Sequence, residues 1–253
     1  MENREYGSIV GNPNARFINK LIREGGLATN DHAVTHPSEP NYLALFAGST
    51  FGIRDDGIHN LRGTSLADQL TGHELSWHVY EQDYPGRCST VSAARGPKDL
   101  VGPGGWYARK HDPAISFVDI ARDPARCADI THLAGFDPAA TSFELIVPNL
   151  TNDMHDGTIA QGDAFLRAFV PRITSSPAFA DGLLLITWDE GTSSRGGGGH
   201  VATIALSPRI TPGARMGASV SHYSILRTVE EALGVPCLRH ACGAGDLGAL
   251  FAP

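Results

Sequence analysis

The stretch Leu183-Leu184-Leu185-Ile186-Thr187-Trp188-Asp189-Glu190-Gly191 has the pattern of a buried strand that ends in two acids and a glycine. A short apolar run bounded by such a turn signal is typical of a strand in the core of a sheet. Proteins of the α/β class bind ligands and metal ions at the carboxyl ends of such strands. We therefore expect a central strand over residues 183–187, with Asp189 and Glu190 at the functional edge of the sheet.

A second segment, His36-Pro37-Ser38-Glu39-Pro40-Asn41-Tyr42, places a hydroxyl just before the apolar run 43–46. Pro40 can take the first position of a helix over residues 40–47, where a missing N–H is tolerated. The free N–H groups and the positive dipole end of a helix favour an alkoxide and a bound phosphate. The two segments together predict a metal-activated serine nucleophile for phosphoryl chemistry. The alternatives are Ser38 as a simple helix cap and the two acids as the start of a solvated loop.

Strand-like and helix-like segments alternate along the chain, which is the pattern of an α/β sandwich. The expected helices cover residues 14–24, 40–47, 65–70, 159–169 and 223–233, and the expected strands cover 75–80, 143–147, 183–187 and 201–206. The stretch 86–114 is rich in Gly, Pro, Ser and Arg, so we expect an irregular insertion over the active-site end of the sheet. Without a repeat or a long linker, residues 1–253 are expected to form a single domain.

The composition is that of a globular protein and limits its partners. The 253 residues are 42% hydrophobic and 19% charged, and the net charge is −7. No run of basic residues is present, so we expect no duplex nucleic acid as a partner, because its binding depends on phosphate neutralisation. The sequence also contains no apolar stretch that approaches a membrane span and no recognisable signal segment.

The four cysteines form no C-x-x-C pair, which argues against a zinc knuckle. Cys237 and Cys242 bracket four residues, a spacing that a local disulfide can close, and Cys88 would then pair with Cys127. Two disulfides predict a secreted or periplasmic protein. Four buried thiols in a cytosolic protein are the alternative.

Seven short motifs follow one another along nearly the whole chain. They are Met1-Glu2-Asn3-Arg4-Glu5-Tyr6, Ser38-Glu39-Pro40-Asn41-Tyr42-Leu43, Tyr107-Ala108-Arg109-Lys110-His111-Asp112-Pro113, Pro148-Asn149-Leu150-Thr151-Asn152-Asp153-Met154-His155-Asp156, Trp188-Asp189-Glu190-Gly191, Gly199-His200-Val201-Ala202 and His222-Tyr223-Ser224-Ile225-Leu226-Arg227-Thr228. In this order they resemble the phosphoesterase family of acid phosphatases and bacterial phospholipases C, within the alkaline phosphatase superfamily. The resemblance implies an alkaline-phosphatase-like αβα sandwich with a central, mostly parallel sheet.

The resemblance makes Ser38 the nucleophile, which takes up the phosphoryl group before water releases it. It assigns Glu2 and Asn3 to one metal-binding pair and Asp189 and Glu190 to another, with Ser38 as a further ligand. A cation on the hydroxyl oxygen would lower its pKa and offset the charge that builds on the phosphoryl oxygens. Because these ligands are all oxygens, they favour Mg²⁺, Mn²⁺ or Ca²⁺ over Zn²⁺.

Three polar residues near these motifs are expected to contact the phosphate. Asn41 lies beside the nucleophile in sequence, and Lys110 and His111 belong to the insertion. His36, two residues before Ser38, is the most interesting of the histidines that no motif assigns.

A second metal is the other possibility that the resemblance raises. Asp153 and His155, with His200 or His222, are similar to the second-metal ligands of two-metal members, although Asp153-Met154-His155 is shorter than their Asp-x-x-x-His. Direct phosphate contact by Asp153 and His222 is the alternative. The imidazoles of His155 and His200 can also serve as proton donors to the leaving group.

In the family an apolar strand precedes the Met-Glu-Asn motif, whereas this sequence begins at Met1. Asp189 and Glu190 alone would under-coordinate a cation. We therefore expect residues 1–9 to be ordered along the sheet, with Glu2 close to Ser38 and Asp189. An apolar, strand-forming extension before Met1 is expected to raise stability and metal affinity, because it would pair backbone groups left open.

The predicted function is metal-dependent hydrolysis of small phosphate monoesters through a phosphoserine. A phosphodiesterase or phospholipase C with the same site is the nearest alternative, and a non-catalytic binding protein of the same fold is the other. A sulfatase is not expected, because the segment after Ser38 lacks the Arg of the C/S-x-P-x-R motif.

Overall fold

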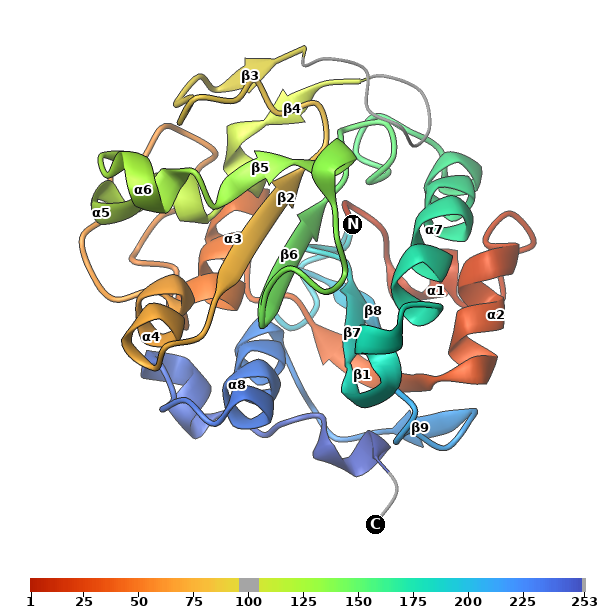
Figure 1. The fold of residues 1–253 in the computed structure, drawn as a ribbon. Coiled ribbons are helices and arrows are strands. Elements are labelled where there is room, and N and C mark those ends of the chain that lie inside the picture. The colour runs from red at the N-terminus through yellow and green to blue at the C-terminus, as the bar shows by residue number, and fades with distance from the viewer. Residues whose placement is uncertain (96–104, 252–253) are drawn as a thin grey trace.

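The computed structural model describes residues 1–95 and 105–251, and its main strands form two sheets (Figure 1). One sheet has the order β5-β2-β6, with β2 at Trp77–Glu81, β5 at Ile130–His132 and β6 at Phe143–Val147. The other has the order β7-β8-β1-β9, with β7 at Leu184–Thr187, β8 at His200–Leu206, β1 at Gly26–His32 and β9 at Ala214–Met216. Strand β2 is parallel to both neighbours, and in the larger sheet β8 alone opposes the other strands. Three of the five ladders in these two sheets are parallel, as expected, and the two antiparallel ladders are those that β8 makes.

Helices cover both faces of the sheets. They are α1 (Tyr6–Ile9), α2 (Arg16–Glu24), α3 (Ser38–Ala47), α4 (Leu66–Gly72), α5 (Val118–Ala121), α6 (Pro124–Cys127), α7 (Ile159–Thr174) and α8 (His222–Leu233). One apolar core joins α1, α2 and α7 to the sheets, and a second joins α3, α4 and α8. Tyr80 of β2 enters the first core and Val79 the second, since successive side chains of a strand point to opposite faces. The expected αβα sandwich is confirmed.

The two sheets do not join into one. Within the described residues no backbone ladder links β6 to β7, and an apolar cavity of about 510 Å³ lies between the two strands. The N-terminus closes one end of this cavity. The Met1 nitrogen donates to the Thr187 carbonyl at 3.0 Å, the Asp189 nitrogen donates to the Met1 carbonyl at 2.9 Å, and the Glu2 nitrogen donates to the Asp153 carbonyl at 2.8 Å. Residues 1 and 2 thus bridge the two sheets.

Several expected elements have different bounds in the structure. Helix α3 begins at Ser38, so Pro40 is its third residue and not its first. Helix α7 continues through Pro171 to Thr174, and strand β1 was not predicted at all. Part of the predicted insertion 86–114, residues 96–104, lies outside the described residues. Its described flanks contribute β3 (Ala93–Ala94) and β4 (Tyr107–Ala108), which pair with each other.

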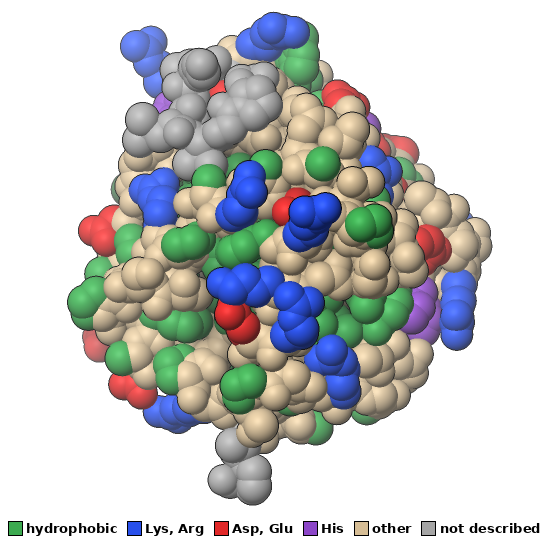
Figure 2. All heavy atoms as spheres, turned by 90° about the vertical axis from the view of Figure 1, so that its right-hand side faces the viewer, with side chains coloured by type: hydrophobic (Ala, Val, Ile, Leu, Met, Phe, Trp, Pro, Cys, Tyr) green, Lys and Arg blue, Asp and Glu red, His purple; other side chains and the backbone are tan. Residues whose placement is uncertain are grey.

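Both predicted disulfides, Cys88–Cys127 and Cys237–Cys242, are present. The first ties the insertion to α6, and the second closes a loop after α8. No helix of the described residues is long and apolar enough to cross a membrane. Figure 2 shows the face over α2 and α7, where several Lys and Arg side chains gather although the whole chain is acidic.

Candidate active site

Ser38 is the first residue of α3 and is 1% exposed. Pro37 before it is extended, and Gly48 ends the helix in the left-handed conformation. The Ser38 hydroxyl does not cap the helix, because it donates to Glu2 Oε2 at 3.2 Å. The expected proximity of Glu2 to Ser38 is therefore confirmed, and the simple-cap alternative is wrong.

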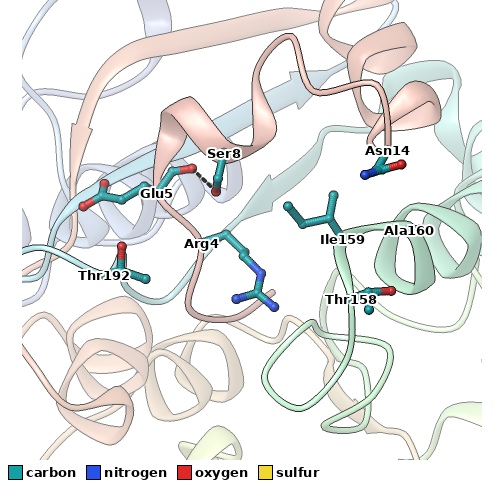
Figure 3. Close-up of a pocket in the computed structure, with 8 residues that line it drawn as sticks. All are labelled: Arg4, Glu5, Ser8, Asn14, Thr158, Ile159, Ala160 and Thr192. Atoms are coloured by element: carbon teal, nitrogen blue, oxygen red, sulfur yellow. Dashed lines mark hydrogen bonds between the residues drawn. The ribbon is translucent and has the colours of Figure 1, made fainter.

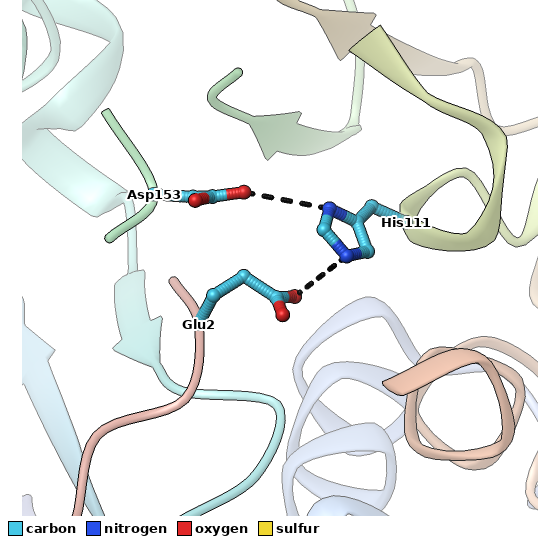
Figure 4. Close-up of side chains that lie close together, drawn as sticks. All are labelled: Glu2, His111 and Asp153. Atoms are coloured by element: carbon cyan, nitrogen blue, oxygen red, sulfur yellow. Dashed lines mark ion pairs between the residues drawn. The ribbon is translucent and has the colours of Figure 1, made fainter. Parts of the chain in front are cut away.

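Glu2 is fully buried and contacts two further side chains. The Tyr42 hydroxyl donates to Glu2 Oε1, and His111 Nε2 lies 3.3 Å from the same oxygen. The Tyr42 ring stacks on the His111 ring at 5.1 Å between centroids. On its other side, His111 Nδ1 lies 3.4 Å from Asp153 Oδ2 (Figure 4). Glu2, His111 and Asp153 thus come together from the N-terminus, the insertion and the loop after β6.

Asp189, just after β7, adds a third carboxylate. Its Oδ1 accepts from the Asn3 nitrogen at 3.2 Å and from the Glu190 nitrogen at 2.6 Å. Burial raises the pKa of Glu2 well above its usual range, and the nearby charges of Asp189 and Asp153 raise it further. Burial also raises the pKa of Asp153 to about 7. The protein therefore concentrates carboxylates here at an electrostatic cost that a bound cation would offset.

The same residues have the chemistry to hold that cation. Ligand atoms of Glu2, His111 and Asp153 lie within 4.8 Å of one another. His111 Nε2, Asp153 Oδ2 and Asp189 Oδ2 are buried without a hydrogen-bond partner. Burial lowers the pKa of His111 to about 3, so its imidazole is neutral, as a metal ligand must be. The donors fit a divalent cation, and they include His111, for which the sequence predicted a phosphate contact.

The Glu190 carboxylate contacts a histidine, unlike the carboxylate of the neighbouring Asp189, which accepts from backbone nitrogens. Its Oε2 lies 2.6 Å from His36 Nδ1, and His36 Nε2 lies 2.9 Å from the Ser193 carbonyl. Burial alone would lower the pKa of His36, but these contacts with Ser193 and Glu190 raise it. Burial raises the pKa of Glu190 to about 7. His36, unassigned by any motif, thus holds Glu190 in place.

Lys110 and His155 form the more exposed rim of the site. Lys110 Nζ lies 3.2 Å from His155 Nε2 and 3.0 Å from Asp56 Oδ2. Asp56 Oδ1 in turn accepts from the Glu39 nitrogen at 3.0 Å, beside the nucleophile. Neither Asp56 nor Tyr42 was assigned a role from the sequence. Tyr42 belongs to the motif that begins at Ser38, so the sequence offered a signal for it. Asp56 lies in a loop outside the motifs, so the sequence offered no signal for it.

Three predicted site residues bind backbone groups around this centre. Asn41 accepts from the Val34 and Thr35 nitrogens and donates to the Thr35 and Pro37 carbonyls. His222 Nε2 lies 2.6 Å from the Asp189 carbonyl, and His200 Nε2 lies 3.0 Å from the Thr29 carbonyl.

These contacts differ from the predicted ones. All four hydrogen-bonding contacts of Asn41 hold the turn before Ser38. His200 stacks on Tyr6 at 4.3 Å between ring centroids, and none of its contacts is with Ser38 or Glu2. The His155 ring contacts Lys110, Asp156 and the His111 ring, and its backbone nitrogen donates to Asp153 Oδ1. Among the described residues, the acids and histidines that come close enough to share a metal ion are Glu2, His111 and Asp153, so the predicted second set of Asp153, His155 and a later histidine is not assembled.

Comparison with known proteins assigns this chain to a family. The sequence profile of the Phosphoesterase family matches residues 9–236. A phosphatidylinositol-3-phosphatase of Mycobacterium tuberculosis is 34% identical over 96% of this chain and 78% of its own length. An acid phosphatase of Aspergillus fumigatus is 30% identical over 98% of this chain, which spans only 56% of that relative.

The fold has counterparts among solved structures. A protein of the alkaline phosphatase superfamily from Vibrio parahaemolyticus superposes with a TM-score of 0.59 at 11% identity, over 93% of this chain and 68% of the other. At this identity the likeness shows the fold alone, and it agrees with the αβα sandwich described above. The chain therefore belongs to the Phosphoesterase family, with an alkaline-phosphatase-like fold, and is a hydrolase of phosphoric ester bonds.

Proposed function

We propose that this protein hydrolyses phosphate monoesters with a divalent cation, through a phosphoserine formed on Ser38. The observation that carries the proposal is the buried contact of the Ser38 hydroxyl with Glu2, at the first turn of α3. An activated serine needs a neighbouring base or a cation. The Ser38 hydroxyl contacts the Glu2 carboxylate, and no imidazole of the described residues is in hydrogen-bond contact with it. That environment supports activation by a metal ion.

The side chains of Glu2, Asp153 and His111 would hold the cation, and Asp189 would lie beside them. Asn3 and Glu190 are the next residues in the chain after Glu2 and Asp189. When bound, the cation would lower the pKa of the serine hydroxyl and stabilise negative charge on the phosphoryl oxygens. The predominance of carboxylates supports Mg²⁺, Mn²⁺ or Ca²⁺, and the one imidazole makes Zn²⁺ the competitor to test.

The residues of this chain would act in two steps. Ser38 passes its hydroxyl proton to the Glu2 oxygen that it contacts, and its Oγ attacks phosphorus as the ester bond to the leaving oxygen breaks. Lys110 would bind a phosphoryl oxygen from the rim. His155, which lies next to Lys110, would donate a proton to the leaving oxygen. Water then attacks the phosphoserine, which releases inorganic phosphate and restores the serine hydroxyl. His200 is not included, because its contacts lie around Tyr6 and Thr29.

The substrate class and location are also part of the proposal. The relatives above are both named phosphatases, which supports phosphate monoesters over diesters. The two disulfides support a secreted or periplasmic location. A diesterase or phospholipase C with the same site is the competing activity.

The test is Ser38→Ala, with the exposed Ser142→Ala as control. We expect Ser38→Ala to retain less than about a hundredth of wild-type turnover with a normal metal content, since removing a nucleophile is usually far more costly. A chromogenic monoester and the matching diester are compared on the wild type. Acid quenching during turnover should trap a phosphorylated peptide that contains Ser38. A Ser38→Ala variant with near-normal turnover would exclude the phosphoserine route.

A further inference from the structure

The carboxylate of Glu5 lies inside the loop that follows β7. Its Oε1 accepts from the Ser193 nitrogen and its Oε2 accepts from the His200 nitrogen, both at 3.0 Å. Figure 3 shows the Glu5 side chain extending toward Thr192 of this loop, while the Glu5 carbonyl accepts from Ser8. Glu5 therefore connects the N-terminal segment to both ends of residues 193–200.

The loop backbone closes tightly around this carboxylate. A Cβ atom on Gly191 would lie 2.9 Å from the Glu5 carboxyl carbon, and one on Gly199 would lie 3.0 Å from Glu5 Oε1. The Gly191 nitrogen donates to the Gly198 carbonyl at 2.7 Å, which draws the two arms of the loop together. Two positions of the loop thus lack side chains where the Glu5 carboxylate fits.

The same loop carries the acids of the site at its start. Asp189 and Glu190 precede Gly191 directly, and no regular strand or helix holds the segment between β7 and β8. The backbone of Ser193 has a partner on each side: its nitrogen donates to Glu5, and its carbonyl oxygen lies 2.9 Å from His36 Nε2. His36 also holds the carboxylate of Glu190. The position of these acids therefore depends on what anchors the loop.

We propose that Glu5 is a positioning residue for the cation site: it anchors the β7–β8 loop, so that Asp189 stays beside Glu2 and Glu190 stays against His36. The inference rests on the proposed metal-dependent function. Some groups orient the ligands of a metal without contacting the metal. Mutation of such a group typically lowers the affinity of the site for the metal by about 10- to 100-fold. Glu5 has the contacts of such a group, since each of its carboxylate oxygens accepts from a backbone N–H of the loop.

The first test measures the affinity of the full chain for Mn²⁺ alone, by calorimetry. We expect Glu5→Ala to raise the dissociation constant by about 10- to 100-fold. Glu5→Gln should lie between wild type and Glu5→Ala, because the amide keeps one acceptor oxygen for two donors. Glu24→Ala, which removes an exposed acid on α2, is the control and should leave the affinity unchanged. In the metal-free protein, hydrogen exchange of residues 189–200 should be faster in Glu5→Ala than in the control.

A second test uses the close approach of Gly191. Gly191→Ala should reproduce the loss of Mn²⁺ affinity, because the added methyl group displaces the Glu5 carboxylate. In the double variant with Glu5→Ala, the methyl group has nothing to displace, so the combined loss should be close to that of Glu5→Ala alone.

The outcomes separate this inference from the proposed function. If wild type binds no divalent cation, the proposed metal-dependent function fails. If wild type binds Mn²⁺ and Glu5→Ala binds it equally well while losing stability to urea, Glu5 is only structural and the inference is overturned. Fully additive losses in the double variant would also contradict it, because the two residues would then act separately.

Discussion

The Met1 nitrogen donates to the Thr187 carbonyl at 3.0 Å, and the Met1 carbonyl accepts from the Asp189 nitrogen at 2.9 Å. This pair of bonds around Trp188 is the pattern of a parallel ladder. Met1 therefore sits where the last residue of a strand parallel to β7 would lie. That position also brings Glu2 to Ser38, so the order of the N-terminal segment and the geometry of the site are linked.

An apolar, strand-forming extension of about five residues before Met1 should stabilise the protein. It would run along β7 into the cavity of about 510 Å³ and pair backbone groups at the facing edges of β6 and β7. A net gain of about 2 kcal/mol would raise Tm by about 4–8 °C for a chain of this size. Affinity for Mn²⁺ should rise as well, since Glu2 would be held more firmly.

The control for this extension is a Gly/Ser segment of the same length, which cannot fill an apolar cavity. Calorimetry on both forms gives Tm and affinity. Equal values for the two extensions would show that the cavity does not accept a strand.

Asp189→Asn and Glu190→Gln should both lower metal affinity and turnover. Asp189→Asn should have the larger effect, because Asp189 acts electrostatically on Glu2, whereas the Glu190 carboxylate is held by His36. Elemental analysis after gel filtration measures the bound metal, and turnover is assayed in parallel. Full metal occupancy in both variants would show that neither acid is a ligand.

Glu39→Gln should flatten the pH dependence of stability. Burial raises the pKa of Glu39 to about 7 from an ordinary value of 4.5, so the folded state binds a proton that the unfolded state has lost in this range. Its contribution to stability is full below about pH 4.5 and is lost as the pH rises through 7. Gln keeps an acceptor for the Ser116 hydroxyl, which lies 3.0 Å from Glu39.

The measurement is urea unfolding of both proteins, without metal, from pH 4.5 to 7.5. The stability of wild type relative to Glu39→Gln should fall as the pH rises. Curves that stay parallel across this range would mean that Glu39 does not titrate between the two pKa values.

The two disulfides should contribute unequally to stability. Cys88–Cys127 spans a sequence separation of 39 and Cys237–Cys242 a separation of 5. From loop-closure entropy, their loss should lower the free energy of unfolding by about 4 and about 2 kcal/mol, respectively. Paired Cys→Ala variants, unfolded in urea, measure this. A larger loss at Cys237–Cys242 would contradict the entropic argument for this chain.

Sequence patterns predicted helices α2, α3, α4, α7 and α8 and strands β2, β6, β7 and β8, but they missed β1, β5 and β9 of the two main sheets. Strand β1 shows why. This segment, Gly26–His32, is polar along half of its length, so no hydrophobic alternation marks it. Two of its polar side chains find partners on neighbouring strands, since Asp31 Oδ2 accepts from the Thr203 hydroxyl and the Thr29 hydroxyl donates to the Met216 carbonyl. These partners are more than 170 residues away, and local pattern carries no information about them.

The sequence by itself determined the αβα architecture, the disulfide pairs and the family, because periodicity, cysteine spacing and ordered motifs are local or additive signals. It also predicted the proximity of Glu2 to Ser38. Only the tertiary structure decided which side chains surround Glu2, placing Tyr42 and His111 there and turning Asn41 and His200 to backbone groups. The reason is that side-chain partners depend on how loops from different strands meet at one edge of the sheets, and the positions of those loops are set by packing across the whole chain.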